Sequence, residues 1–245
     1  MRIITLGTSH GNHTPGRFVS STLLEIGERC YLIDAGEPAS AQMFRAGIPF
    51  KNLRAVFITH MHDDHTSGLS ALVKALHKYP VEGQHTDFYF AEEAAIVPFC
   101  GWLGACHVTN TEGLVHYHAT KEGFVFKDEN ITVTAIPTRH MSGGQPSFAY
   151  LIEAEGKRML FTGDLTPDFS DFPQNMGHLD VCVCEGTHYK PELALPILQK
   201  ADIQKLIFNH VHELWIGNGE DVYLQNYVSL PYLVMVAHDL EVFSV

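Results

Sequence analysis

The stretch Thr59-His-Met-His-Asp-Asp-His65 constrains this chain more than any other part of its sequence. It gathers three imidazoles and a carboxylate within six positions, at His60, His62, Asp64 and His65. Neutral imidazole nitrogens and carboxylate oxygens are ligands that zinc, manganese and iron accept. A polar loop that is rich in histidine by chance is the simpler alternative, and the spacing favours a metal site over it.

The flanking residues place this cluster between a strand and a helix. Residues 55–59 form a short apolar run rich in β-branched side chains, which is typical of a buried strand. After the cluster, apolar side chains recur with the period of an amphipathic helix, at Leu69, Leu72, Val73 and Leu76. Ligands of α/β sheets commonly bind just outside the carboxyl ends of the strands. We expect His60 and His62 to face one position and Asp64 and His65 a second, which suits two metal ions better than one.

Length and composition predict one globular domain over residues 1–245. Hydrophobic residues make up 45% and charged residues 18% of the chain, which is ordinary for a protein with a sizeable core. The sequence has neither an apolar run of transmembrane length nor a signal-peptide pattern at its start, so we expect a cytoplasmic protein without membrane contact. The net charge of −12 argues against a broad phosphate-binding surface, although a metal centre can still attract a small anionic substrate.

Five cysteines in a chain without an export signal predict reduced thiols. Cys182 and Cys184 alternate within an apolar run, which favours small core residues of a buried strand. Cys106 next to His107 is a weak metal-like pair, for which a structural role is likewise favoured.

The hydrophobic pattern predicts a sheet-rich core covered by helices. Strands are expected at residues 3–6, 22–26, 30–34, 55–59, 87–91, 131–136, 148–153, 159–162, 181–184, 206–209 and 240–243. Helices are expected at residues 39–46, 67–78, 92–103, 192–201 and 221–228. Several of these strands end at or close to a polar or titratable residue, namely Asp34, His60, His140, Asp164, Glu185 and His210. Six such endings predict one crevice that collects groups from many strands.

The motif His60-x-His62-x-Asp64-His65, followed by later histidine and aspartate positions, resembles the metallo-β-lactamase superfamily of metal-dependent hydrolases. Its nearest branches are the ribonuclease Z-like and small phosphodiesterase proteins. The resemblance covers nearly the whole chain and implies an α+β fold, an αββα four-layer sandwich of two mixed β-sheets flanked by helices. It also implies a dinuclear metal site on one edge of the sandwich.

The same resemblance implies two divalent metal ions, with zinc the first expectation and manganese or iron the alternatives. The implied ligands are His60, His62 and His140 for one ion, Asp64, His65 and His210 for the other, and Asp164 between them. A metal-bridging hydroxide would be the nucleophile, since metal ions lower the pKa of bound water. Asp34 matches a position that orients the first histidine of such sites.

Two ligand positions have competitors in the sequence. His107, His116 and His118 compete with His140, which is favoured because a strand precedes it and its spacing to Asp164 fits. His212 competes with His210, which is favoured because it directly follows a strand. His10, His13, Arg139 and His212 remain unassigned candidates around the pocket.

His188 follows Glu185 at the end of a predicted strand and is the candidate general acid. Histidine can hold a proton near neutral pH and deliver it to a leaving alkoxide. Phosphodiesterase members of the superfamily carry a similar acidic residue and histidine there, and a surface histidine is the simpler alternative. Asp64 is expected to share in proton handling while it serves mainly as a ligand.

Position 62 and residues 141–163 indicate which reactions the sequence disfavours. A histidine at position 62, where the di-iron oxidoreductase branch has glutamate, disfavours redox chemistry. Residues 141–163 are mostly taken up by two strands, which leaves no room there for a tRNA-grasping arm. We therefore expect a phosphodiesterase for a small phosphodiester or cyclic nucleotide. The alternatives are hydrolysis of a lactone, thioester or amide, then tRNA 3′-processing, then metal binding without turnover. A large nucleic acid is not expected as substrate. The sequence leaves the oligomeric state open, and a homodimer is one candidate because superfamily members are often dimers.

Overall fold

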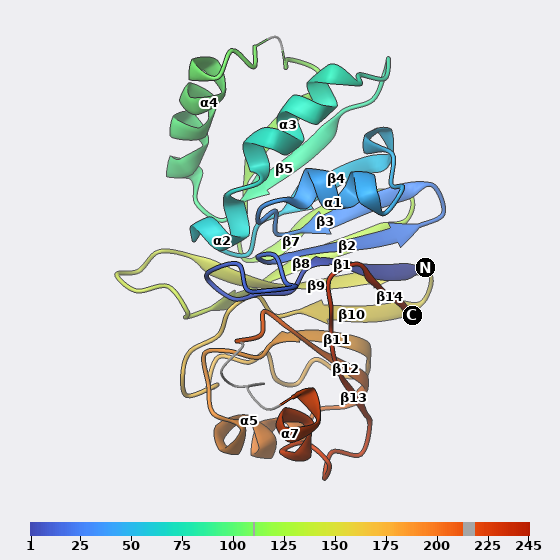
Figure 1. The fold of residues 1–245 in the computed structure, drawn as a ribbon, viewed down its shortest axis with the longest axis vertical. Helices are drawn as coiled ribbons and strands as arrows, with labels where there is room; N and C mark the ends of the chain where they lie inside the picture. The colour runs from blue at the N-terminus through green and yellow to red at the C-terminus, as the bar shows by residue number, and fades with distance from the viewer. Residues whose placement is uncertain (110, 213–218) are drawn as a thin grey trace.

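The computed structural model describes residues 1–109, 111–212 and 219–245. Two seven-stranded sheets lie face to face, and helices cover the outer face of each (Figure 1). The first sheet has the strand order β14-β1-β2-β3-β4-β5-β6, and the second has the order β13-β12-β11-β10-β9-β8-β7. The expected αββα sandwich of two mixed sheets is confirmed.

The two longest runs of consecutive strands are β1 to β3 and β6 to β11, and helices are interspersed among the other described strands. The strands are β1 Arg2–Gly7, β2 Ser21–Ile26, β3 Arg29–Ile33, β4 Leu53–Phe57, β5 Thr86–Phe90, β6 Val115–Ala119, β7 Gly123–Lys127, β8 Ile131–Thr138, β9 Ser147–Ala154, β10 Lys157–Phe161, β11 Leu179–Glu185, β12 Ile203–Asn209, β13 Leu233–Val236 and β14 Glu241–Ser244. The helices are α1 Ala39–Arg45, α2 Asp63–Thr66, α3 Leu69–Lys78, α4 Ile96–Ala105, α5 Pro191–Leu198 and α7 Glu220–Gln225, with 3-10 turns η1 Phe50–Asn52 and η2 Glu93–Ala95.

Strand direction explains how distant residues reach one edge of the molecule. In the first sheet, β1, β2 and β3 pair antiparallel, and β3 to β6 pair parallel. In the second sheet, β7 to β10 pair antiparallel, and β10 to β13 pair parallel. Because β8 and β10 are both antiparallel to β9, they run in the same direction. The carboxyl ends of β8, β10, β11 and β12 therefore lie on one edge of their sheet, as those of β3 and β4 do on theirs.

The core between the two sheets is aromatic and fully buried. Tyr31, Phe57 and Tyr150 have no exposed surface and belong to this layer. The Tyr150 hydroxyl donates a hydrogen bond of 2.8 Å to the carbonyl of Ile58 and lies 3.0 Å from the Thr120 hydroxyl. Since a buried hydroxyl needs a partner, these contacts fix the second sheet against the segment that follows β4.

The outer layers are made by amphipathic helices. The expected apolar face of α3, at Leu69, Leu72, Val73 and Leu76, is buried against the first sheet. On the other side, α5 and α7 cover the second sheet (Figure 1). No helix among the described residues is long and apolar enough to cross a membrane. Cys182 and Cys184 are fully buried in β11, which confirms the core role expected for them.

The structure differs from the predicted elements in several places, both in which elements exist and in where they begin and end. Strands β6, β7 and β13 were not expected, and all of them lie at the margins of the sheets. The predicted helix over residues 92–103 is a 3-10 turn followed by α4. The predicted helix over residues 67–78 begins at Leu69, and a separate short helix, α2, holds Asp64 and His65. The second half of the histidine cluster is therefore helical, and helical geometry turns these two side chains away from the preceding strand direction.

Candidate metal centre

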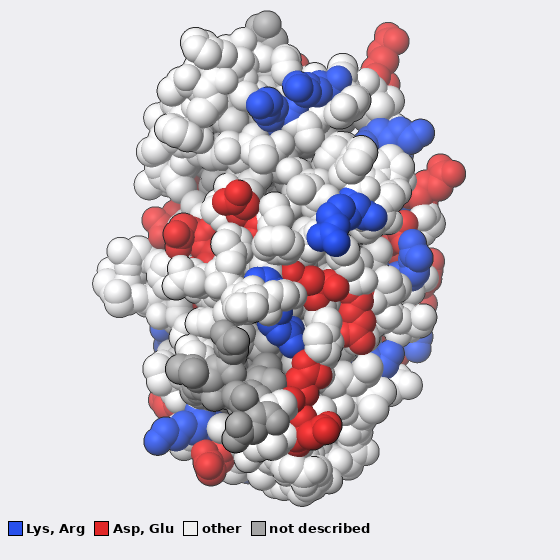
Figure 2. Space-filling view, viewed as in Figure 1, with Lys and Arg blue, Asp and Glu red and all other residues white. Residues whose placement is uncertain are grey.

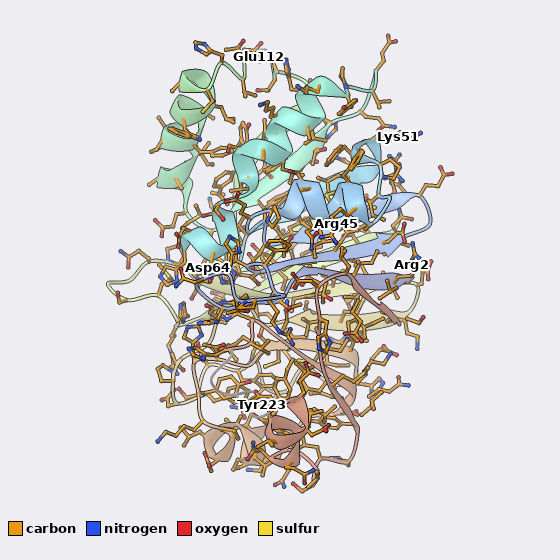
Figure 3. All side chains as sticks on the ribbon, in the orientation of Figure 1. Arg2, Arg45, Lys51, Asp64, Glu112 and Tyr223 are labelled. Carbon is orange, nitrogen blue, oxygen red and sulfur yellow. The ribbon has the colours of Figure 1, made fainter. Side chains whose placement is uncertain are left out.

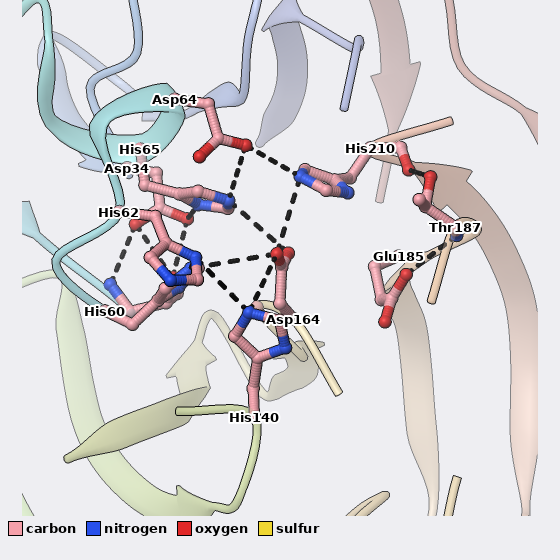
Figure 4. Close-up of polar contacts among 12 residues, drawn as sticks. Asp34, His60, His62, Asp64, His65, His140, Asp164, Glu185, Thr187 and His210 are labelled. Carbon is pink, nitrogen blue, oxygen red and sulfur yellow. Dashed lines mark hydrogen bonds and ion pairs between the residues drawn. The ribbon is translucent and has the colours of Figure 1, made fainter. Parts of the chain in front are cut away.

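The residues that follow β4 meet those that follow β8, β10 and β12 at one edge of the sandwich (Figure 4). Figure 3 shows Asp64 at this edge on α2, whereas Tyr223 lies far away on α7. The site is buried: His60, His65, Asp164 and His210 each expose at most 3% of their surface. The expected crevice that collects groups from many strands is present in the structure.

One group of donors consists of His60, His62, His140 and Asp164. The Nδ1 atom of His62 lies 3.0 Å from His60 Nε2 and 3.3 Å from His140 Nε2. Asp164 Oδ2 lies 3.7 Å from His60 Nε2 and 3.6 Å from His140 Nε2. Three imidazole nitrogens and a carboxylate oxygen therefore converge on one point.

A second group consists of Asp64, His65 and His210. Asp64 Oδ2 lies 3.4 Å from His65 Nε2 and 3.1 Å from His210 Nε2. Asp164 also reaches this group, with Oδ1 at 3.4 Å from His65 Nε2 and Oδ2 at 3.5 Å from His210 Nε2. Among the described residues of these two groups, Asp164 is the carboxylate that faces both, as Figure 4 shows.

The neighbours of three histidines decide which ring nitrogen carries the proton. The carboxylate of Asp34 can only accept, so the Thr59 hydroxyl donates to it, at 2.9 and 3.0 Å. The Thr59 oxygen then accepts from Nδ1 of His60, at 3.1 Å. His65 Nδ1 donates to Asp34 at 2.7 Å, and His140 Nδ1 donates to the carbonyl of Leu165 at 3.3 Å. In all three rings Nε2 faces the centre, and the neutral form of each ring offers its lone pair there.

This donor set fits divalent cations. His65 Nε2 and Asp164 Oδ1 are buried and have no hydrogen-bond partner among the described residues. The atoms around these two are imidazole nitrogens and carboxylate oxygens that can also donate electron pairs. A cation bound among them would give every one of these buried polar atoms a partner. Histidine and aspartate without cysteine are the ligands of zinc, manganese or iron sites.

The pKa values of the candidate ligands reflect how closely their charges and rings are packed. Burial and the neighbouring imidazole of His65 hold the pKa of His60 well below its usual value, which keeps the ring in the neutral form that binds metals. Burial opposes the ionisation of Asp164, but the surrounding histidines outweigh it and hold its pKa well below the usual range. For His65, the carboxylates of Asp164 and Asp34 outweigh burial and raise the pKa well above its usual value. A metal ion would take the place of that proton.

Asp34 lies beside the first histidine of the motif, which it was expected to orient. It reaches His60 through the Thr59 hydroxyl, and it also bonds His65 directly, a contact that the sequence did not predict. Thr59 was missed as a functional residue, and its position between the strand and the first histidine was the available signal. The Thr59 backbone N–H also donates to Asp34, at 2.8 Å, so one carboxylate orders both ends of the motif.

Two close approaches require glycine near the ligands. Gly163, directly before Asp164, has φ +58°, and a Cβ atom there would lie 2.7 Å from the Thr59 Cβ. A Cβ on Gly36 would lie 2.2 Å from the carbonyl oxygen of Asp64. Side chains at these positions would displace the backbone that carries two of the candidate ligands.

His188 lies beside the centre and is held by Glu185. Both oxygens of the buried Glu185 carboxylate are used: Oε1 lies 3.1 Å from His188 Nδ1, and Oε2 accepts from the backbone N–H groups of Thr187 and His188. His188 Nδ1 is 3.7 Å from Asp164 Oδ2, and its ring stands 4.6 Å from that of His140. Burial lowers the pKa of His188, but the hydrogen bond and charge of Glu185 outweigh it and raise the pKa to about 9.

The other histidine candidates lie outside the two donor groups of the centre. His116 and His118 are in β6 next to Asp87, outside the centre. The rings of His212 and His10 are in contact, with centroids 4.0 Å apart and an interplanar angle of 39°. The charges of His210 and Asp64 act on His10, so this pair borders the pocket.

The remaining candidates, Arg139, His13 and the pair Cys106 and His107, are not among the donors of the centre. Arg139 donates to the Ser170 hydroxyl, and its backbone N–H donates to Asp171. His13 packs edge-on against Phe18, with ring centroids 5.6 Å apart. The exposed Cys106 and His107 belong to none of the donor groups found among the described residues.

Comparison with known proteins links the chain to a described family. The family model for "Anti-Pycsar protein Apyc1" matches residues 1–183. A ribonuclease Z of Microcystis aeruginosa is 35% identical over 146 residues, which cover 57% of this chain and 44% of the relative. A ribonuclease Z of a Synechococcus species is 32% identical over 174 residues, covering 67% of this chain and 52% of the relative. The chain spans about half the length of the curated relatives it matches.

Solved structures share the fold at low sequence identity. Human tRNase Z, short form, matches with a TM-score of 0.77 at 21% identity over 100% of this chain and 99% of its own. The metallo-β-lactamase fold protein YhfI from Bacillus subtilis matches with a TM-score of 0.77 at 18% identity, covering 99% of this chain and 98% of its own. Zinc-bound PqqB from Methylobacterium extorquens has a TM-score of 0.76 at 17% identity, with both chains fully covered. The expected metallo-β-lactamase fold, close to ribonuclease Z, is confirmed.

Proposed function

The chain belongs to the family described as Anti-Pycsar protein Apyc1, and from this premise we propose that it is a dinuclear metal-dependent phosphodiesterase. Its substrate would be a small phosphodiester or a cyclic nucleotide. The observation that carries the proposal is the position of Asp164, which faces both donor groups at 3.4–3.7 Å. A carboxylate placed in this way can join two cations, and phosphoryl transfer commonly uses a pair of metal ions to stabilise the attacking and leaving oxygens.

In this proposal the two donor groups hold one ion each. His60, His62 and His140 bind the first ion, and Asp64, His65 and His210 bind the second, with Asp164 shared. When bound, the ions would polarise the phosphoryl group and lower the pKa of a water molecule. Zinc is the first expectation for this donor set, with manganese and iron as alternatives.

His188 is proposed as the general acid. Its Nδ1–H donates to Glu185, which leaves Nε2–H to protonate the leaving oxygen of the substrate. Glu185 is a positioning residue, since its two oxygens fix both the ring and the backbone of the turn that carries His188. Asp64 contacts His65 and His210 through Oδ2, and its other oxygen is proposed to share in proton handling.

Two features support a small substrate. The segment between His140 and Asp164 consists of a short connection followed by β9 and β10, so it carries no added arm. Figure 2 shows acidic side chains interspersed with lysine and arginine over the described residues of the face in view, in a chain of net charge −12. A surface for long nucleic acids typically presents a continuous basic stripe instead.

Endoribonuclease activity is the second candidate, because the sequence relatives are named ribonuclease Z. These names favour a nucleic-acid substrate, whereas the sequence analysis expected none of large size. Both candidates break a phosphodiester with the same centre, so the difference lies in how much of the substrate the protein contacts.

A substrate panel tests the proposal with the zinc-loaded protein and, in parallel, the manganese-loaded protein. The panel contains bis-p-nitrophenyl phosphate, cyclic nucleotides, a lactone and a precursor tRNA. We expect turnover of cyclic nucleotides or the synthetic diester, and a large loss of kcat in His188→Ala. His178→Ala is the matched control, since His178 is an exposed histidine paired with Asp202. Turnover of the lactone alone would contradict the proposal, and turnover of the tRNA alone would favour the ribonuclease alternative.

A further inference from the structure

A second cluster of potential metal ligands lies at the far end of the first sheet, around Asp87. This residue is the second of β5, and its register partner in β6 is His116. His85 directly precedes β5. Because β4 and β5 are parallel and His60 follows the end of β4, residues at the start of β5 lie at the opposite end of the sheet from the catalytic candidates (Figure 1).

Three donors of this cluster face one another. His85 Nε2 lies 3.4 Å from Asp87 Oδ2, and His116 Nδ1 lies 3.6 Å from Asp87 Oδ1. The three donor atoms lie within 4.8 Å of one another, and the two imidazole rings are 4.3 Å apart with an interplanar angle of 30°. These separations are longer than good hydrogen bonds but close to the roughly 3.3 Å between two ligands of a tetrahedral zinc ion.

The carboxylate at the centre of the cluster is fixed in place by other residues. His118 Nε2 donates to Asp87 Oδ1 at 2.8 Å and stacks on Tyr89, while Arg54 Nη1 donates to Oδ2 at 2.7 Å. Burial opposes ionisation of Asp87, but the hydrogen bond from His118 and the charge of Arg54 outweigh it and lower its pKa. Partners of this kind hold metal-binding side chains in position in known sites.

The exposure of the three residues fits a site that is open to solvent. The Asp87 side chain is 8% exposed, whereas those of His85 and His116 are 36% and 46% exposed. A buried carboxylate is thus covered by two imidazoles that a dissolved ion can reach. In contrast, an ordinary surface ion pair has both partners in water and little fixed geometry.

We propose that His85, Asp87 and His116 form a second metal site, which binds a divalent transition-metal ion of the zinc class. The ion joins the start of β5 to β6, the last strand of its sheet, with water in the open coordination position. The charge of Arg54 beside the carboxylate makes this site weaker than the catalytic centre. Its role is to stabilise the edge strand, which pairs on one side with β5.

Equilibrium dialysis against zinc alone tests the proposal with the full chain. Wild type is compared with the double variant His85→Ala/His116→Ala and with the control His178→Ala. We expect wild type and the control to bind about one zinc equivalent more than the double variant at saturation, as one additional site requires. Both altered histidines are partly exposed, and circular dichroism checks that the double variant is folded.

A second readout separates this site from the catalytic proposal. Zinc added after the catalytic centre is filled is expected to raise the Tm of wild type and of His178→Ala, but not that of the double variant. Hydrolysis of the synthetic diester is expected to be equal in all three proteins. Equal zinc binding by wild type and the double variant would overturn the second site, whatever the activity. Loss of activity with normal dialysis behaviour would instead bear on the catalytic proposal.

Discussion

At the residue scale, two side chains of the centre depend on an unusual backbone conformation. Asp34 has φ 58° and His210 has φ 53°, both in the left-handed region that residues other than glycine rarely adopt. Such conformations cost on the order of 1–3 kcal/mol each and persist where surrounding contacts fix them. In Asp34 those contacts are the bonds to Thr59 and His65, so the strain is coupled to the order of the histidine motif.

Replacing Asp34 by asparagine tests that coupling. Asparagine tolerates the left-handed backbone, but it lacks the charge that orders His65 and Thr59. We expect metal affinity to fall by about 10–100-fold, the usual effect of losing a residue that orients a ligand. Competition with a chelating dye measures the affinity, and an unchanged value in Asp34→Asn would show that this carboxylate does not orient the ligand.

The role of His188 has a pH signature. The pKa of this residue is raised to about 9, so the imidazolium is present at neutral pH and is lost as the pH rises through that pKa. A general acid therefore predicts that kcat falls on the alkaline side. In His188→Ala we expect kcat to drop by about 10²–10⁴-fold and the alkaline fall assigned to His188 to vanish. The measurement is the pH dependence of kcat for both proteins, and an alkaline limb unchanged in the variant would rule out this role.

At the element scale, the site is made by strand ends. Strands of both sheets end at one edge because β3 and β4 run parallel and because β8, β10, β11 and β12 run in one direction. The polar residues that follow each strand then meet without any single long loop. Gly163 matters here, since it lets the chain leave β10 against Thr59 and deliver Asp164 to the middle of the centre.

A pair of alanine variants separates steric packing from backbone strain. Gly163 and Gly156 both have positive φ, 58° and 76°, but a Cβ atom would clash with Thr59 at Gly163 and would meet nothing within 4 Å at Gly156. We expect Gly156→Ala to lose about 1–2 kcal/mol of unfolding free energy through backbone strain. Gly163→Ala should lose clearly more, together with metal affinity. Urea unfolding measures both, and equal losses would show that the contact with Thr59 is unimportant.

The strands that were not predicted lie at the edges of the sheets. β6, β7 and β13 are the last strands of their sheets and are only partly buried, so they lack the fully buried pattern of a central strand. The apolar run Leu233–Val236 of β13 was nevertheless a readable signal in the sequence. The central strands and the residues at their ends were predictable, because burial on both faces leaves a clear apolar pattern. The cluster around Asp87 was not predictable, since it depends on β6 pairing with β5.

The roles assigned to the candidate ligands remain predictions, although the structure brings all of them together. The sequence alone could separate His140 from His107, His116 and His118 through the strand that precedes it. It could not reveal that Asp34 bonds His65, because that contact depends on where α2 turns this side chain.

At the scale of the whole molecule, the metal centre exists only in the folded protein, because its candidate ligands are far apart in the sequence and come from both sheets. A ligand that binds only the folded state stabilises it according to the free ligand concentration relative to Kd. A metal ion present at 100 times its Kd contributes about 2.7 kcal/mol, and for a chain of this size each kcal/mol corresponds to roughly 2–4 °C in Tm. Removal of metal by a chelator is therefore expected to lower the Tm by about 5–11 °C per site under such conditions. Differential scanning calorimetry with and without chelator measures this shift, and an unchanged Tm would show that the folded protein does not hold the metal.

The central claim is that one edge of the sandwich holds two metal ions. Metal content per chain, measured by elemental analysis after purification without added metal, tests it most directly. The background is His85→Ala/His116→Ala, so that the proposed surface site does not contribute. We predict about two equivalents, and about one after the further change His210→Ala. A single equivalent that His210→Ala leaves unchanged would contradict the account.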